Sequence, residues 1–281
     1  MKLVSFLHDG STGFGVVTGD AVIDLSNHDV GRSLKHVLER DALDQLADLA
    51  ADMAPDLSTK DIDFLPCVVN PNKILCIGIN YRKHVLEMGR ELPEYPWVFT
   101  RFADSFVGHG ANMLRPAALS RNFDFEGELA VIIGSAAHRV AAADALDHVA
   151  GYTCLNDGSI RDYQRHSSQF TAGKNFLKSG SIGPWLVTPD ELGDASKLDL
   201  ETRLNGEVMQ SSPTSDLIFD IPALIEYCSA FTRLEPGDII ATGTPGGVGA
   251  ARTPPVWMQP GDTIEVSISG IGVLRNTIAD E

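Results

Sequence analysis

The stretch Asp124-Phe125-Glu126-Gly127-Glu128 runs directly into an apolar segment, Leu-Ala-Val-Ile-Ile at 129–133. Side chains of an extended strand alternate between two faces, so the three acids are expected on one face. Like charges at this spacing raise one another's pKa and destabilise a fold unless a cation lies between them. A divalent cation bound by oxygen is the simplest remedy. The alternative is an acidic edge strand that solvent alone screens.

A second polar cluster, Asn156-Asp157-Gly158-Ser159, ends another apolar strand expected at 149–155. It can supply one more carboxylate, from Asp157. Two strands that deliver three carboxylates are typical of a site for a hard cation, where water or substrate completes an octahedron. The two segments together therefore predict a metal site.

Length and composition are those of a globular chain. The 281 residues allow one large domain or a main domain with a small appendage, and 43% hydrophobic residues suffice for a core. The cysteines are far apart and form no C-x-x-C pair, which argues against a zinc ribbon, a redox dithiol or a disulfide framework. Free buried thiols fit a reducing cytosol, so a cytoplasmic location is expected. These cysteines are Cys67, Cys76, Cys154 and Cys228.

The net charge of −16 argues against nucleic acid or an anionic membrane as a partner, because both require a positive face. No stretch approaches the roughly 18 apolar residues of a membrane span. A small anionic substrate stays compatible with the charge, since a bound cation inverts the local field.

The order of patterns predicts a β-dominated α+β fold in two parts. Residues 1–68 are expected to form a small N-terminal α+β domain, with short strands before residue 26 and one acidic helix at about 33–54. Residues 69–281 are expected to form a larger, strand-rich domain. Its helices are predicted at about 81–90, 142–148 and 220–231, and Asn205-Gly206 predicts a two-residue hairpin turn. Its strands are predicted at 73–79, 97–99, 129–133, 149–155, 198–204, 238–242, 263–268 and 273–277.

Three further segments carry possible chemistry. His84 and Glu87 share a face if 81–90 is helical, and a carboxylate beside an imidazole makes a general base for water. The alternative is an incidental surface pair. Lys174 lies in a predicted glycine-flanked loop. Its functional interpretation is an electrophile or an anchor for a carboxylate, and the alternative is a solvated lysine. The glycine-rich loop 242–249 either presents backbone N–H groups to an anion or is a tight structural turn.

Taken in order, these segments resemble the fumarylacetoacetate hydrolase superfamily, in its branch of acylpyruvases and 2-hydroxyhepta-2,4-diene-1,7-dioate isomerases. The resemblance covers residues 70–281. Its matching pieces are 73–81 with His84 and Glu87, 124–134, 151–157, Arg161-Asp162 with Gln164, Gly173-Lys174, 183–185, 234–249 and 270–272. The chain departs from the common pattern in two places. It has Asn175-Phe176-Leu177 where many relatives have Ser-Phe-Asp, and it has Thr100-Arg101 after Phe99, where a lysine is frequent in the family.

The resemblance implies a mixed β-roll catalytic domain, a homodimer and a bound Mg²⁺, with Mn²⁺ or Ca²⁺ as alternatives. It implies metal ligands at Glu126, Glu128 and Asp157, and a water-activating pair, His84 and Glu87, on a lid. It also implies that Lys174 faces the substrate. The candidate substrate-binding residues are Arg101, Arg161, Gln164 and Thr244.

The expected reaction is hydrolysis of a C–C bond in a 2,4-dioxo acid, an acylpyruvate-like compound of aromatic catabolism. The metal would chelate the 2-oxo acid unit, and the product carbanion would be taken up as an enolate. The alternative is decarboxylation or keto–enol tautomerisation of an oxaloacetate-like or 2-hydroxymuconate-like acid at the same site. A protein with a purely structural cation is the non-enzymatic alternative.

Overall fold

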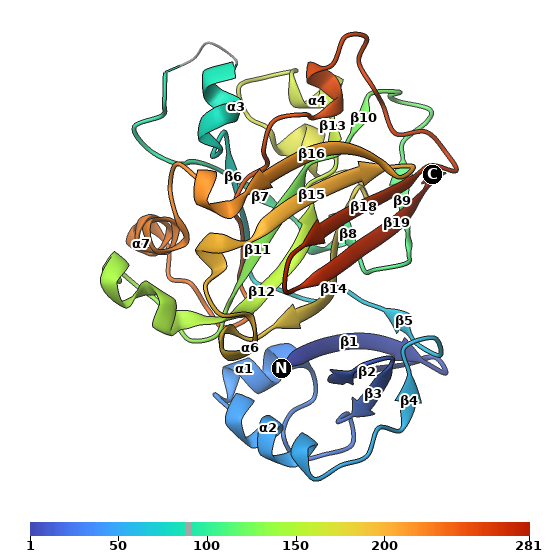
Figure 1. Ribbon diagram of the computed structural model, residues 1–281, viewed down its shortest axis with the longest axis vertical. Coiled ribbons are helices and arrows are strands. Elements are labelled where there is room, and N and C mark those ends of the chain that lie inside the picture. Colours follow the sequence, from blue (N-terminus) through green and yellow to red (C-terminus); the bar gives the residue numbers. More distant parts are fainter. Residues whose placement is uncertain (88–90) are drawn as a thin grey trace.

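The computed structural model describes residues 1–87 and 91–281, apart from the side chains of residues 84, 86 and 87. Within these residues twelve strands form one sheet, in the order β4-β3-β2-β1-β14-β12-β11-β17-β6-β7, with β5 paired to β1 and β8 to β14 (Figure 1). The strands of this large sheet are β1 (Lys2–His8), β2 (Ser11–Thr18), β3 (Ala21–Asp24), β4 (Leu57–Ser58), β5 (Asp63–Phe64), β6 (Ile74–Gly78), β7 (Trp97–Arg101), β8 (Phe106–Val107), β11 (Gly127–Ile133), β12 (Val149–Asn156), β14 (Gly180–Val187) and β17 (Ile239–Ala241).

Two smaller sheets complete the β structure of the described chain. A five-stranded sheet has the order β16-β15-β18-β19-β9, and β10 pairs with β13. Their strands are β9 (Asn112–Arg115), β15 (Asp199–Leu204), β16 (Glu207–Pro213), β18 (Thr263–Ile268), β19 (Gly272–Asp280), β10 (Phe123–Asp124) and β13 (Ser159–Ile160).

The helices are short and lie around the sheets (Figure 1). The α-helices are α1 (Leu34–Glu39), α2 (Leu43–Ala51), α3 (Arg82–Glu87), α4 (Arg161–Gln164), α5 (Thr171–Lys174), α6 (Pro189–Leu192) and α7 (Ile221–Phe231). The 3-10 helices are η1 (Ala103–Ser105), η2 (Ala142–His148), η3 (Ala195–Lys197), η4 (Thr214–Asp216) and η5 (Gly249–Ala251).

Strand β11 is buried on both faces, which explains why its sequence is a continuous apolar run. Leu129 and Val131 face a core that also contains Leu200 and Val266 of the five-stranded sheet, so the two sheets pack face to face. Ala130, Ile132 and other residues of the opposite face share a second core with α1 and α2. Burial on both sides fixes the register of β11, and with it the acids at its beginning.

The predicted β-dominated α+β fold is confirmed, and each strand predicted in the catalytic part overlaps an observed one. The hairpin at Asn205-Gly206 joins β15 to β16. Both residues have positive φ, 52° and 82°, as the favoured two-residue hairpin turn requires.

The helix predictions were partly wrong. The segment expected as one helix at 33–54 is two helices, since Asp41 between them adopts a positive φ of 52°. The expected helix at 142–148 is a 3-10 helix, and Lys174 ends the short helix α5 instead of lying in a loop. Helix α3 covers 82–87 of the predicted 81–90, and residues 88–90 lie outside the described chain.

Residues 1–64 form the lower lobe of the molecule in Figure 1. This lobe is joined to the rest by strand pairing as well as by the chain, because Lys2 and Leu3 of β1 pair with Val187 and Leu186 of β14. The division at residue 68 stays a prediction. Among the described helices, none has the length and apolar character needed to cross a membrane.

Candidate metal and substrate site

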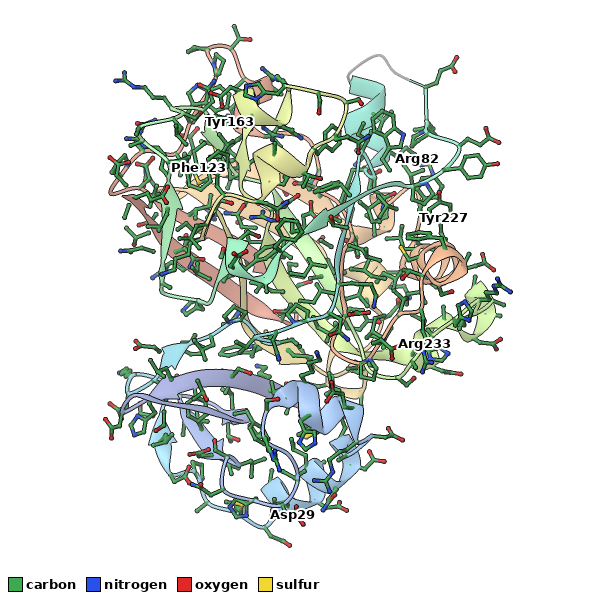
Figure 2. The ribbon with its side chains drawn as sticks, turned by 180° about the vertical axis from the view of Figure 1, so that it is seen from behind. Asp29, Arg82, Phe123, Tyr163, Tyr227 and Arg233 are labelled. Carbon is green, nitrogen blue, oxygen red and sulfur yellow. The ribbon has the colours of Figure 1, made fainter. Side chains whose placement is uncertain are left out.

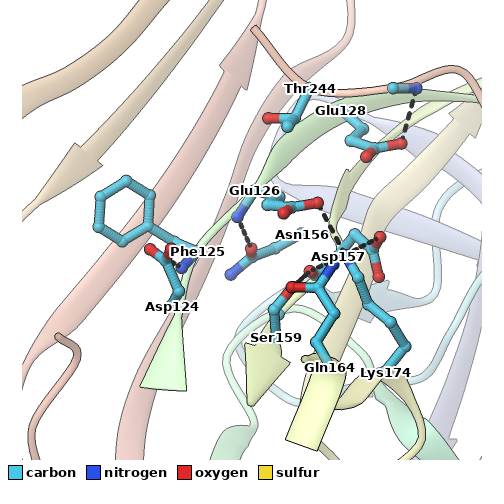
Figure 3. A network of polar contacts seen from close by, with 12 residues as sticks. Asp124, Phe125, Glu126, Glu128, Asn156, Asp157, Ser159, Gln164, Lys174 and Thr244 are labelled. Carbon is cyan, nitrogen blue, oxygen red and sulfur yellow. Dashed lines mark hydrogen bonds and ion pairs between the residues drawn. The ribbon is translucent and has the colours of Figure 1, made fainter. Parts of the chain in front are cut away.

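Three carboxylates meet where β11 begins and β12 ends. The antiparallel register sets Gly127 opposite Asn156, and the Asp157 N–H donates to the Glu126 carbonyl at 2.8 Å. As a result, Glu126, Glu128 and Asp157 each present a carboxylate oxygen within 4.8 Å of the other two (Figure 3). The acids predicted as metal ligands are thus brought together, and all three are buried.

Gly127, between two of these acids, permits this close packing. A Cβ atom at this position would lie 2.0 Å from the Oγ1 atom of Thr202 on β15, far inside contact distance. Only glycine lets β11 approach the five-stranded sheet here, so Glu126 and Glu128 flank a position that no larger residue can occupy without displacing β15.

Asp124 does not share the face of the other acids, contrary to the expectation from strand alternation. β10 ends at Asp124 and β11 begins only at Gly127, so the alternation is interrupted. The Asp124 carboxylate accepts hydrogen bonds from Arg161 Nε at 2.7 Å and from the backbone N–H groups of Gly249 and Ala250 at 2.8 and 2.9 Å. The glycine-rich loop therefore does present N–H groups to anions, and these anions are carboxylates of the protein: Gly249 donates to Asp124 and Gly243 donates to Glu128.

Buried cations lie directly against the clustered acids. The ammonium of Lys174, only 1% exposed, is 2.8 Å from Glu126 and 2.6 Å from Asp157. Arg161 Nη2 is 2.6 Å from Glu126, and Arg101 Nη1 is 2.7 Å from Asp157. These contacts offset part of the repulsion that the sequence pattern implied.

The electrostatics differ between the acids. Burial favours the neutral form of Glu126, but Lys174 and Arg161 beside it hold its pKa below the ordinary value. Burial, followed by repulsion from Asp157 and Glu126, raises the pKa of Glu128 well above the ordinary value. Its recorded hydrogen bond comes from the Gly243 N–H at 2.8 Å, and no described lysine or arginine forms an ion pair with it. An oxygen cluster in which one carboxyl group has no described cationic partner, and is disfavoured as an anion until a cation binds, fits a hard divalent cation.

Glu126, Glu128 and Lys174 form the buried floor of a cavity of about 380 Å³. Asp157 does not line this cavity and lies against Lys174. Ile77, Ile79, Phe99, Phe170 and Val248 form an apolar part of its wall, and polar side chains from α4 and the glycine-rich loop form the rest. The cavity thus combines an acidic, cation-bridged floor with a largely apolar wall, as small-molecule sites commonly do.

The substrate-binding predictions need correction. Arg101 does not line the cavity: its guanidinium is fully buried beneath Asp157 and also bonds to Ser105 and Ser179. Its role is to hold Asp157, because its donors are used by the protein.

Arg161, Gln164 and Thr244 do line the cavity. Arg161 donates to Asp124, Glu126 and the Gln164 side-chain oxygen, the last at 2.8 Å. The Thr244 hydroxyl donates to the Gly127 carbonyl at 2.9 Å. Among these three, only the Gln164 amide nitrogen has no recorded partner in the described chain. Arg161 and Thr244 therefore have fewer free donors for a substrate than the sequence suggested.

The predicted pairing of His84 with Glu87 stays a prediction, because the side chains of both residues lie outside the described part of the chain. Helix α3, which carries them, is at the same end of the molecule as α4 (Figure 1). Sequence reasoning missed Arg165, which lines the cavity. The signal was its spacing of four from Arg161, which places both arginines on one side of a helical turn.

Residues 73–279, which contain the sheet-rich fold and the acid-lined cavity, match the family described as Fumarylacetoacetate (FAA) hydrolase C-terminal. The chain belongs to this enzyme family, which confirms the resemblance found in its motifs.

Among its relatives, oxaloacetate tautomerase YisK of Bacillus subtilis is 46% identical over 75% of this chain and 71% of its own length. The mitochondrial oxaloacetate tautomerase FAHD2A of Bos taurus is 38% identical over 99% and 91%.

Solved structures agree with this placement. Fumarylacetoacetate hydrolase from Exiguobacterium antarcticum is 34% identical, with a TM-score of 0.86 and coverage of 100% of both chains. Maleylpyruvate hydrolase from Sphingobium sp. SYK-6, in complex with manganese(II) and pyruvate, is 30% identical with a TM-score of 0.84, over 100% of this chain and 99% of that one.

Proposed function

We propose that this protein is a divalent-metal-dependent tautomerase that interconverts the enol and keto forms of a 2-oxo dicarboxylic acid such as oxaloacetate. The observation that carries the proposal is the cluster of three buried carboxylates at the cavity, with the Lys174 ammonium against two of them. The activity named for two curated relatives, oxaloacetate tautomerase, favours this reaction over the hydrolysis expected from the sequence.

Glu126, Glu128 and Asp157 would hold the cation, since their oxygens are buried and close together. Mg²⁺ suits an all-oxygen set, and the manganese(II) of the maleylpyruvate hydrolase structure supports Mn²⁺ as an alternative. When bound, such an ion supplies Lewis-acid stabilisation of negative charge on a substrate oxygen.

Lys174 would stabilise negative charge on the substrate oxygen at C2 through its own positive charge, while its N–H groups stay bonded to Glu126 and Asp157. Burial alone would lower the pKa of this lysine, but Asp157 and Glu126 beside it raise that pKa above the ordinary value. The side chain is therefore protonated at neutral pH and stabilises developing negative charge instead of accepting a proton.

Tautomerisation also requires a group that moves a proton to or from C3. The predicted His84–Glu87 pair is the candidate, since an imidazole titrates near neutral pH. The apolar wall made by Ile77, Phe99 and Phe170 limits the number of water molecules beside C3. A reaction that transfers protons and consumes no water suits this wall.

A second candidate is hydrolysis of a C–C bond in an acylpyruvate. The observation that favours it is the similarity over the whole chain to maleylpyruvate hydrolase, whose structure contains pyruvate. In that reaction His84 and Glu87 would activate a water molecule. The homodimer implied by the resemblance stays a prediction for either reaction.

The test is a direct comparison of substrates with Mg²⁺ or Mn²⁺ present. Freshly dissolved enol-oxaloacetate is followed by its ultraviolet absorbance, and pyruvate release is measured from oxaloacetate, maleylpyruvate and acetylpyruvate. We expect faster loss of the oxaloacetate enol without matching pyruvate release, abolished by chelation of the metal. Pyruvate release from maleylpyruvate or acetylpyruvate, with loss of that activity in His84→Ala, would instead identify a hydrolase.

A further inference from the structure

The hydrogen-bond donors around the cavity fall into two groups. Arg161 and Lys174 are each bonded to two buried carboxylates, and the Thr244 hydroxyl donates to a backbone carbonyl. These donors are part of the protein's own polar network. A substrate that took them over would leave buried acids without partners, which is costly.

Arg165 is different, because its backbone is fixed while its guanidinium is free. It caps the C-terminus of α4, where its N–H donates to the carbonyls of Arg161 and Asp162. Its side chain lines the cavity and is exposed. Within the described residues it forms no ion pair and no side-chain hydrogen bond, unlike Arg161 one helical turn earlier.

The charge of the site indicates what such a free cation would meet. With every group of the site ionised, four buried carboxylates face three buried cations, which leaves one excess negative charge. These residues are Asp124, Glu126, Glu128 and Asp157 with Arg101, Arg161 and Lys174. A divalent ion reverses this to one positive charge, and Arg165 makes it two. A dianionic substrate would neutralise the complete site.

The shape of the cavity separates the two ends of such a substrate. Two of the acids and Lys174 lie at the floor, while Arg165 extends from an exposed position in the wall. Apolar side chains, among them Phe170 and Val248, make up much of the remaining wall. A 2-oxo acid with its head at the floor would thus direct its far end toward the guanidinium of Arg165.

We propose that Arg165 is the specificity-determining residue that binds the distal carboxylate of a dicarboxylic 2-oxo acid whose 2-oxo head lies at the acidic floor. This inference rests on the proposed function and deepens it. An exposed arginine that becomes covered by substrate forms a charge-assisted hydrogen bond with a carboxylate, often through two parallel N–H groups.

The test uses a pair of substrates that differ in one group. Oxaloacetate and 2-oxobutyrate share the 2-oxo acid head and chain length, and a methyl group replaces the distal carboxylate in the second. Exchange of the C3 protons for deuterium, followed by NMR in the presence of Mg²⁺, reports turnover of both. The variants are Arg165→Ala and Arg165→Lys, with Arg121→Ala as the control, because Arg121 is also exposed but does not line the cavity.

We expect Arg165→Ala to lower kcat/KM for oxaloacetate about tenfold or more, mainly through KM, and to leave 2-oxobutyrate within about twofold. Arg165→Lys should recover part of the lost kcat/KM, and Arg121→Ala should show no loss. Inhibition by oxalate, which offers only the head group, should not change in any variant.

Equal losses for both substrates, or no loss for oxaloacetate, would overturn the assignment of Arg165 while the tautomerase stands. Absence of exchange with either substrate in the unmodified protein would overturn the proposed function. In that case a dicarboxylate whose binding raises Tm equally in the unmodified protein and in Arg165→Ala would also exclude Arg165 as its ligand.

Discussion

The floor and the wall of the cavity are built on opposite principles. At and beneath the floor, the buried Asp157 carboxylate pairs with Lys174 at 2.6 Å and with Arg101 at 2.7 Å. On the wall, Arg165 is exposed and has no described partner, and Phe170 is half-buried. A rigid, paired floor suits chemistry that a whole family shares, whereas free groups on the wall suit the selection of one substrate. Mutations at the two places should therefore have different consequences.

The largest effect is expected from Glu128→Gln, which removes one of the three candidate metal ligands. Loss of Lewis-acid assistance should lower kcat by at least about 100-fold. Because Glu128 is the acid with no described cationic partner, the free energy of unfolding of the metal-free protein should not fall. Metal titration calorimetry, steady-state kinetics and urea unfolding measure the three quantities. Glu207→Gln, on the exposed end of β16, is the control, and an unchanged metal affinity in Glu128→Gln would contradict the ligand assignment.

The next prediction compares the substitution of arginine by methionine beneath the floor and on the wall. Arg101→Met removes one of the two buried cations that pair with Asp157, together with the donor to Ser105 and Ser179, and should lower the free energy of unfolding by about 3–5 kcal/mol. Arg165→Met breaks no described contact and should change it by less than about 0.5 kcal/mol. Urea unfolding at neutral pH measures both. Similar values for the two variants would mean that the floor is not the paired network described above.

The smallest effect concerns the access of solvent to Cys76, a buried residue of β6. Burial, followed by repulsion from Asp157 and Glu128, raises the pKa of Cys76 well above the ordinary value. Burial also raises the pKa of Cys67 to about 11 and that of Cys228 to about 12. Since the thiolate is the reactive form, a disulfide reagent at pH 8 should label none of the thiols in the folded protein and all of them in urea. Rapid labelling of Cys76 in the folded state would show that solvent reaches the protein interior close to Asp157 and Glu128.

The sequence predicted the sheets and the cluster of acids because both follow from local patterns. Apolar runs predicted β11 and β12, and the acids at their ends had to meet once the two strands paired. The residues that neutralise those acids could not be predicted in the same way. The Arg101–Asp157 pair spans 56 positions, and only the folded chain decides that Arg101 points under the floor and not into the cavity.

The interrupted alternation at Asp124 has the same origin. Period-two reasoning assumes one continuous strand, and the break between β10 and β11 depends on the pairing of β10 with β13, which is distant in sequence. Arg165 was missed for the opposite reason. An exposed arginine on a polar segment is ordinary, and it becomes notable only when the structure shows which cavity it lines.

The pairing of β1 with β14 joins residues outside the family match to a strand within it. The match begins at residue 73, yet Leu186 and Val187 of β14 are covered by β1, while β8 covers only the beginning of the strand at Gly180 and Ser181. A chain shortened to residues 69–281 would expose this edge together with the apolar face that Leu3 and Phe14 now cover. Unprotected strand edges pair with other copies. The first residues of the chain thus cover a strand edge that would otherwise be open to pairing with another copy.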